Sequence, residues 1–339
     1  MTPTQLMLGS LSDNAIRWAT IIAALSMLGY AAQWAYRRER ATATLAAAPV
    51  ERELVGTGGP SSLGPVGDAA APTQGDRQNA VDDAAAAADM RRLRRADAFA
   101  RIGFNLLALC AVVLTAGVVC RGIAAERVPW SNMYEFATAG TSVILLAYLA
   151  VRRRLALGWM GFPLVSVVLV LLMLATIVLY TPTAGLIPAL KSYWLSVHVT
   201  AAVLGTALFS LGAVASAAQL VRARVERRGS TALRRWPSAA RIDAVAYRLN
   251  AFAFPIWTFA LIAGAVWAQH AWGRFWGWDP KETWMFISWV GYAAYLHARA
   301  TPGWRSRLPW LSLFAYATIL FNLVGVNVFI TGLHSYAGV

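Results

Sequence analysis

The sequence predicts an all-α fold, a polytopic bundle of about eight transmembrane helices with a tryptophan-rich loop on the extracytoplasmic side. The chain has 339 residues, of which 58% are hydrophobic and 14% charged. Its mean hydropathy is +0.52, a balance that soluble proteins of this size rarely have. Runs of about 20 apolar residues recur along the chain, each long enough to cross a bilayer as a helix. The net charge of +14 comes mostly from Lys and Arg between these runs, which indicates positive-inside anchoring rather than nucleic-acid binding.

The apolar runs define the expected elements and the domain organisation. The eight spans are expected at about residues 17–36, 98–120, 133–151, 158–180, 193–221, 250–270, 283–299 and 310–332. The first lacks a small-residue cleavage site, so residues 1–36 are interpreted as a retained transmembrane anchor. Residues 37–97 are rich in Ala, Gly, Pro and Asp and are expected to be a disordered cytoplasmic linker. Residues 98–339 would form the membrane domain.

The basic loops predict the orientation of the spans. They hold Arg37, Arg38 and Arg40, then Arg91 to Arg95, Arg152 to Arg154, Arg222 to Arg235, and finally Arg299, Arg305 and Arg307. Since Lys and Arg near span ends resist translocation, these loops are expected in the cytoplasm. With eight alternating spans, both termini and the loop at 272–284 are then extracytoplasmic.

The two cysteines do not suggest redox chemistry. Cys110 and Cys120 fall within one predicted helix, which would hold them too far apart to form a disulfide with each other. Neither belongs to a CxxC motif. We interpret both as small packing residues, with a thiol role for Cys120 as the lesser alternative.

The densest motif is the run WGRFWGWDPKETW at residues 272–284. Trp272, Trp276 and Trp278 cluster there around Gly273 and Gly277. One interpretation is an interfacial aromatic belt. The other is a flat apolar platform, because tryptophan rings are large and planar and glycines let the backbone approach a ligand closely. A large planar ligand with charged edges, such as haem, would suit this platform.

Charged residues of the same run allow two interpretations. Asp279, Lys281 and Glu282 either hold the loop together or meet the carboxylates of such a ligand, for which Arg274 and Lys281 carry the right sign. Glu135 opens the third span and either lines the same cavity or interacts with the helix N-terminus. Walker, dinucleotide-binding and nucleophile-elbow motifs are missing from the sequence.

The histidines provide candidate iron ligands. His198 and His334 flank the aromatic loop on the outer side, and together they are expected to be axial ligands of haem iron. The alternative for His198 and for His334 is a hydrogen-bonded residue at the membrane interface. For His270 this interfacial role is the favoured interpretation. His297 lies ~20 Å below the outer end of the seventh span, at 1.5 Å per residue. It either ligates iron with a partner ligand from another subunit or reaches the inner interface beside Arg299.

The motifs together resemble a known family. The run 272–279 is similar to the WWD signature of haem-handling proteins, which the CcmC and CcmF proteins of system I share. With SNMYE at 131–135, YLHAR at 295–299 and GLHSYAG at 332–338, the chain resembles the CcsA/ResC proteins of system II cytochrome c biogenesis. Phe275 and Gly277 stand where Tyr and Ser are common in that family.

The resemblance implies a function that we state as an expectation. The chain would be the CcsA/ResC-type subunit of a cytochrome c synthase (haem lyase) in the bacterial plasma membrane. It would bind haem b through His198 and His334, with Trp272, Gly273, Trp276, Gly277, Trp278 and Asp279 around the ring. His297 would share haem with a CcsB/ResB partner. Its other partners would be apocytochrome c, whose CxxCH motifs receive the haem, and thiol-reducing proteins.

Two other functions stay open from the residues. One is haem export to a separate chaperone, as in CcmC-like proteins. The other is a structural or sensor role in which the aromatic loop docks a protein partner.

Overall fold

A computed structural model describes residues 2–46, 74–183, 192–230, 233 and 236–333, with the backbone alone for 37–46 and 74–77. Within these ranges the chain is helical and has no strand. It forms two compact units, one of residues 1–28 with 102–339 and one of residues 29–101. His334 lies outside the described residues.

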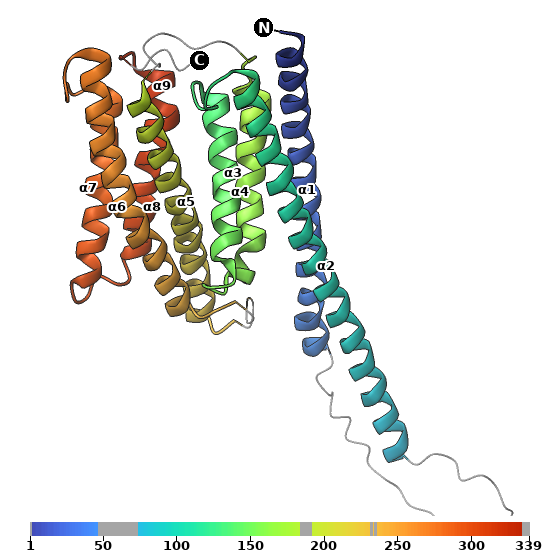
Figure 1. Cartoon of the computed structure of the whole chain (residues 1–339). Helices are drawn as coiled ribbons and strands as arrows, with labels where there is room; N and C mark the ends of the chain where they lie inside the picture. Colours follow the sequence, from blue (N-terminus) through green and yellow to red (C-terminus); the bar gives the residue numbers. More distant parts are fainter. Residues whose placement is uncertain (1, 47–73, 184–191, 231–232, 234–235, 334–339) are drawn as a thin grey trace, which may run out of the picture. The chain divides into compact units, whose positions relative to one another are not determined.

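The helices follow the expected order (Figure 1). They are α1 (Pro3–Ala46), α2 (Gln74–Ala124), α3 (Met133–Arg152), α4 (Gly161–Met173), α5 (Tyr193–Arg227), α6 (Ala239–Trp272), α7 (Pro280–Ala300), α8 (Leu308–Leu320) and α9 (Val326–Phe329). A 3₁₀-helix, η1 (Leu157–Met160), precedes α4, and the π-helices η2 (Leu174–Val178) and η4 (Phe321–Gly325) follow α4 and α8.

Seven helical stretches of the described chain are long and apolar enough to span a membrane. They correspond to seven of the eight expected spans. The eighth, expected at 283–299, is α7, a helix of 21 residues. Its Trp, Tyr and His residues lower its hydropathy, so it does not reach the same criterion. The polytopic helical fold is confirmed.

The first two helices extend further than expected into the proposed linker. α1 continues to Ala46 and α2 begins at Gln74, so residues 37–46 and 74–97 are helical in this structure. The alanine run at 84–88 explains part of this, because alanine has the highest intrinsic helix propensity. Residues 47–73 lie outside the described ranges.

The centre of the larger unit is the pair α5 and α6, which pack along most of their length. Glycines bring the two helices close together. A Cβ at Gly212 would lie 2.0 Å from Asn250 Oδ1, and one at Gly205 would lie 3.1 Å from the ring of Trp257. Small residues at helix contacts are typical of membrane bundles, where close packing drives association. This pair therefore forms the rigid wall on which the candidate site is built.

Buried polar side chains connect this pair to α7 and α8. Asn250 Nδ2 donates to Ser312 Oγ at 3.0 Å, and Ser216 Oγ donates to the same oxygen. On another level, Trp257 Nε1 donates to Ser288 Oγ at 3.1 Å. Polar groups buried in a membrane domain need such partners.

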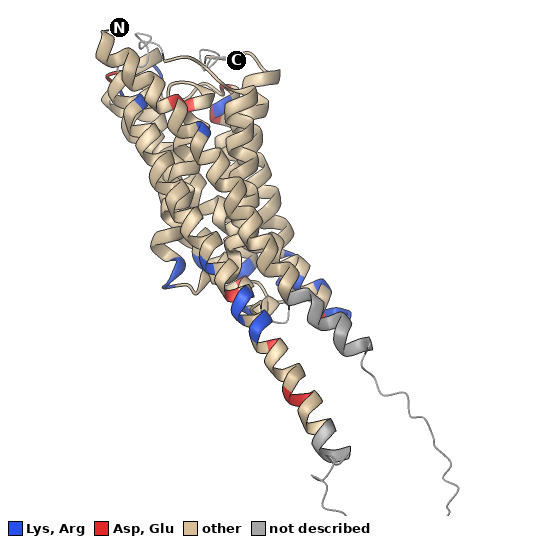
Figure 2. Ribbon diagram, turned by 90° about the vertical axis from the view of Figure 1, so that its right-hand side faces the viewer, with Lys and Arg blue, Asp and Glu red and all other residues tan. Residues whose placement is uncertain are grey.

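The two ends of the larger unit differ in charge. α3, α5 and α7 all end in basic turns, and Figure 2 shows Lys and Arg gathered at that end. At the opposite end, Gln5 of α1 bonds to Glu126, and the Leu333 amide bonds to the 272–284 loop through Asp279. This arrangement is the one that the positive-inside pattern predicts.

Both cysteines lie in α2 without a disulfide. Cys110 is buried, and its Sγ donates to the Ala19 carbonyl. The prediction that they do not pair is confirmed.

Candidate functional site

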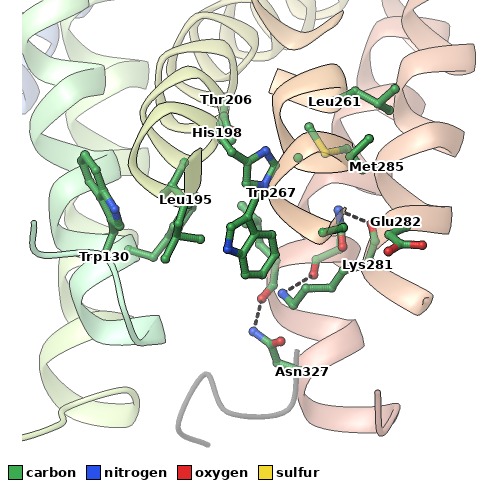
Figure 3. A pocket seen from close by; sticks show the side chains of 18 of the residues that line it. Trp130, Leu195, His198, Thr206, Leu261, Trp267, Lys281, Glu282, Met285 and Asn327 are labelled. Atoms are coloured by element: carbon green, nitrogen blue, oxygen red, sulfur yellow. Dashed lines mark hydrogen bonds between the residues drawn. The ribbon is translucent and has the colours of Figure 1, made fainter. Parts of the chain in front are cut away.

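A cavity of about 180 Å³ lies at the less basic end of the bundle. Its walls come from α5, α6, α7, η4 and the start of α3 (Figure 3). Trp272, Phe275 and Trp276 of the 272–284 loop also line it. Tryptophans dominate the lining, namely Trp130, Trp257, Trp267, Trp272 and Trp276. An apolar cleft with a few polar groups is the usual form of a small-molecule site.

His198 of α5 projects into this cavity from the α5–α6 wall. Its Nδ1 lies 2.8 Å from the Ala260 carbonyl, and because a carbonyl accepts, Nδ1 is the donor. The lone pair of the neutral ring is then on Nε2, the nitrogen that would ligate a metal. The ring lies parallel to that of Trp267, with centroids 6.2 Å apart.

Gly264 makes room for this imidazole. A Cβ at this position would lie 2.7 Å from His198 Cε1 and Nδ1, closer than any real Cβ contact. Residue 264, one turn after Ala260, therefore has to lack a side chain for the His198 ring to reach the Ala260 carbonyl.

Glu282 organises the tryptophan loop. Its carboxylate accepts the Gly277 amide at 2.9 Å and the Asp279 amide at 3.1 Å, and Arg274 Nη1 lies 3.3 Å away. A Cβ at Gly277 would lie 1.7 Å from that guanidinium. Glycine is thus required where the loop folds over Arg274.

Asp279 joins this loop to the end of the described chain. Its carboxylate caps α7 through the Lys281 amide at 3.1 Å and accepts the Leu333 amide at 2.8 Å. A Cβ at Gly332 would lie 2.8 Å from Asp279 Oδ2. The residue that precedes His334 in sequence is therefore fixed to the tryptophan loop.

Lys281 and Asn322 form a reciprocal contact on the cavity wall. Lys281 Nζ donates to the Asn322 carbonyl, and Asn322 Nδ2 donates to the Lys281 carbonyl, both at 3.3 Å. Asn322 belongs to the π-helix η4, where the Val326 amide bonds to Phe321 instead of Asn322. Burial lowers the pKa of Lys281 to about 8, while the Asp279 carboxylate opposes this effect. The lysine stays mainly protonated at neutral pH.

A buried ionic network supports the opposite wall. Glu135, fully buried, accepts Arg121 Nε at 3.0 Å, Arg127 Nη1 at 2.6 Å and the Ser131 amide at 2.9 Å. Arg121 is buried as well and reaches Asp13 of α1 at 3.4 Å. This network orders the segment before α3, which contributes Trp130 to the cavity.

The structure brings together some of the predicted site residues. His198, Trp272 and Trp276 line one cavity. Trp278, 68% exposed, does not line it and packs edge-on against Trp276 with centroids 5.6 Å apart. Gly273 ends α6 with a φ of +70°, a left-handed conformation that glycine tolerates. Asp279 and Gly277 shape the loop.

The other histidines lie outside the cavity lining. His297 is exposed near the basic end of α7, so the structure does not bring it to His198. His270 is exposed, with Nδ1 2.8 Å from the Val266 carbonyl, as an interfacial residue would be.

Sequence reasoning missed several residues of the site. Trp257 and Trp130 are distant from the 272–284 run in sequence, and Trp267 lies five residues before it. Packing places all three in the same cavity as the run. Gly264 was recognisable in principle, because it precedes Trp272 on the same helix by eight residues, a spacing close to two turns.

The chain is similar to several known proteins. A family model described as "Cytochrome C assembly protein" matches residues 130–334. The chain is 32% identical to the cytochrome c biogenesis protein CcsA of Guillardia theta, covering 69% of this chain and 85% of that protein. It is 31% identical to CcsA of Gloeobacter violaceus, with coverages of 72% and 88%. It is 33% identical to CcsA of Microcystis aeruginosa, with coverages of 69% and 87%.

Proposed function

Because the chain belongs to the CcsA family of cytochrome c biogenesis proteins, we propose that it binds haem b as a substrate in the tryptophan-lined cavity. It presents this haem for covalent attachment to apocytochrome c. The role in cytochrome c biogenesis follows from the family. Haem binding and the attachment step are the proposal.

The observation that carries the proposal is the setting of His198. Its imidazole lies in an aromatic cavity, its Nδ1 is held by a backbone carbonyl, and Gly264 leaves space for the ring. Fixing one nitrogen of a histidine orients the other toward a metal. An aromatic wall beside such a ligand fits a planar porphyrin better than a small polar substrate.

In this proposal the chain positions haem and the porphyrin supplies the reactive groups. His198 ligates one face of the iron and His334 the other, while Trp272 and Trp276 pack against the ring. The histidine of an apocytochrome CxxCH motif then replaces one axial ligand. Each thiol adds across a vinyl group, with sulfur bonding to one carbon and hydrogen to the other, so the addition needs no oxidant.

The cavity volume of about 180 Å³ bears on how haem enters. Drug-sized ligands occupy clefts of roughly 300–1,000 Å³, and a porphyrin is larger than many of these ligands. In the proposed cycle the 272–284 loop therefore moves outward when haem enters, and the Asp279 contact to Leu333 opens with it.

His297 has a separate role in the proposal. It is exposed on α7, on the same helix face as Ala294 and Val290, so the surface beside it is open to a second protein. We assign it to a haem site shared with a CcsB/ResB-like subunit. The bilayer is then a bacterial plasma membrane, with the cavity and both termini on the extracytoplasmic side.

Absorbance spectra of the full chain, purified with its partner subunit, test the proposal. We expect a Soret band that His198→Ala and His334→Ala each diminish and that added imidazole restores. His270→Ala is the matched control, because its ring is exposed and outside the cavity. A wild-type complex without a Soret band, or one unaffected by the His198 and His334 variants, would contradict haem ligation here.

A second measurement separates synthesis from export. The purified complex is supplied with haem, reductant and an apocytochrome peptide containing CxxCH. Thioether product detected by mass spectrometry supports the synthase function. Haem binding without product, but with transfer to a soluble acceptor, would favour the export function instead.

A further inference from the structure

Lys281 is an unusual cation in this chain. Lys191 and Lys281 are the two lysines among 30 Lys and Arg residues, and Lys281 lines the cavity. Its ammonium group donates one hydrogen bond within the described part of the chain, to the neutral carbonyl of Asn322. An ammonium group has three donors, so this contact uses only part of its capacity.

The neighbouring carboxylates do not form an ion pair with Lys281 in the described structure. Glu282 is engaged by Arg274 and two loop amides. Asp279 accepts the amides of Lys281 and Leu333. Both acidic side chains therefore hold the loop, and the hydrogen-bond acceptor of the Lys281 ammonium group among the described residues is a neutral carbonyl.

Such an arrangement is costly unless an anion completes it. Removing a charge from water without a counter-charge is strongly unfavourable, and the lowered pKa of Lys281 reflects this cost. The adjacent Asn322 Oδ1 is buried and has no hydrogen-bond partner among the described residues. The polar corner at Lys281 and Asn322 is thus incomplete without a ligand or water.

We propose that Lys281 is the carboxylate-binding group of the cavity and that it takes a propionate of haem. The inference rests on the proposed function and adds the group that recognises the ring edge. In haem the propionates lie on one edge and the vinyl groups elsewhere on the rim. Anchoring a propionate at Lys281 therefore fixes the rotation of the ring about the iron and turns the vinyl groups away from this corner.

The π-helix supplies the resting partner for this cation. In an α-helix the Asn322 carbonyl would accept the amide four residues later, but in η4 the Val326 amide bonds to Phe321. The released carbonyl holds Lys281 while the cavity is empty of ligand. A carboxylate, being charged, is a stronger acceptor than this carbonyl.

Haem and its dimethyl ester provide the test, since they ligate through the same iron and differ only in the carboxylates. Binding of each to the full chain with its partner is followed by the Soret band in wild type, Lys281→Gln, Lys281→Arg and His198→Ala. We expect Lys281→Gln to weaken haem by about tenfold to a hundredfold, the scale of one charge-assisted hydrogen bond. The affinity for the dimethyl ester should change little in Lys281→Gln. Lys281→Arg should retain most of the haem affinity.

The comparison separates the possible failures. Equal weakening of haem and ester by Lys281→Gln would mean that the lysine only supports the fold, which overturns the proposal. Unchanged haem binding by Lys281→Gln would also overturn the proposal. His198→Ala should weaken both ligands alike, and a wild type that binds neither would reject the proposed function as well. As a second readout, haem but not its ester should protect Lys281 from reductive methylation, detected by mass spectrometry.

Discussion

The position of the His198 imidazole depends on a single missing methyl group. The ring reaches the Ala260 carbonyl because Gly264 has no Cβ, and that contact determines which nitrogen is presented to the cavity. In a helix interior glycine is normally less favourable than alanine by about 1 kcal/mol. The site therefore keeps a locally unfavourable residue to place its ligand.

Gly264→Ala is expected to displace His198 without unfolding the bundle. The added Cβ would lie 2.7 Å from the ring, so the ring has to leave Ala260. Haem affinity should fall by roughly tenfold or more, the scale of one lost charge-assisted contact. Soret titrations measure this. Gly140→Ala in α3 is the control, because a Cβ there meets nothing within 4 Å, and equal losses in both variants would contradict the assigned role.

Lys281 predicts a specific pH dependence of stability. Lys281 lies in the first turn of α7, before the predicted span at 283–299, and its pKa is about 8 in the folded chain against an ordinary value of 10.5. Between these values the unfolded chain binds more protons, so stability rises with pH. Relative to Lys281→Met, the wild type should gain up to about 3 kcal/mol from pH 8 to 10.5. Thermal unfolding in detergent at several pH values measures the difference, and parallel curves would contradict it.

At this scale the sequence predicts residue types better than partners. His198, Trp272 and Trp276 stand out because histidine and clustered tryptophan are rare and chemically specific, and they share one cavity. The charged residues of the loop left two functions open. The structure shows that Glu282 and Asp279 bind loop amides, whereas Lys281 lines the cavity. The sequence does not distinguish these roles, because they depend on the direction of the backbone within a turn.

At the scale of elements, the tryptophan loop is fixed at both ends by capping interactions. Gly273 in a left-handed conformation ends α6, and Asp279 begins α7 with a capping box completed by Glu282. The same carboxylate of Asp279 also holds Leu333. One residue therefore sets both a helix start and the position of the C-terminal segment.

Asp279→Ala should release that segment as well as weaken α7. Loss of an N-cap costs about 1 kcal/mol, and the Leu333 amide loses its acceptor. Hydrogen exchange followed by mass spectrometry should show faster exchange for the peptide ending at Leu333. Thr283→Ala, which removes a hydroxyl contact to Trp278 at the same helix end, is the control and should leave that exchange unchanged. Equal exchange rates in both variants would contradict the assigned role of Asp279 in holding Leu333.

The helix boundaries show which helix ends can be predicted from the apolar runs alone. Expected spans at 133–151 and 193–221 begin within a residue of α3 and α5, because the polar-to-apolar change coincides with the helix start. The ends of α1 and α2 were missed, since helices can continue in polar, alanine-rich sequence after the apolar run has ended. Neither π-helix has a signal in the apolar period.

At the scale of the whole larger unit, buried charge connects the first helix to the site. Asp13 of α1, Arg121 of α2 and Glu135 of α3 form one network with Arg127. The network lies directly behind the segment that carries Trp130. Residues near the start of the chain thus help to order the cavity, although they match no recognised motif.

Glu135→Gln is expected to be among the most destabilising single substitutions in this unit. It leaves Arg121 and Arg127 without their buried counter-charge, and breaking a buried pair costs about 3–5 kcal/mol. Asp13→Asn should cost less, because its side chain is 19% exposed. Unfolding in detergent tests the order. Glu126→Gln, on the exposed loop beside it, is the control, and a similar loss there would refute the network's importance.

The helical bundle was predictable because it follows from hydropathy, whereas the orientation inferred from the arginines stays a prediction. The cavity was not predictable, because it depends on how three tryptophans of α6 meet Trp130 and Trp276. Pairing of helices in a membrane is decided by close steric fit, for which glycines such as Gly205 and Gly212 give only a faint signal in a single sequence.

The π-helical turn of η4 accommodates one more residue than an α-helix would over the same rise. Shortening Phe321–Gly325 by one residue would restore ordinary winding while leaving everything downstream, including Asn327, on its present face. The Asn322 oxygen would then return to the main-chain ladder. Lys281 would then lose the carbonyl to which its ammonium group donates, although no side chain of α7 had been changed.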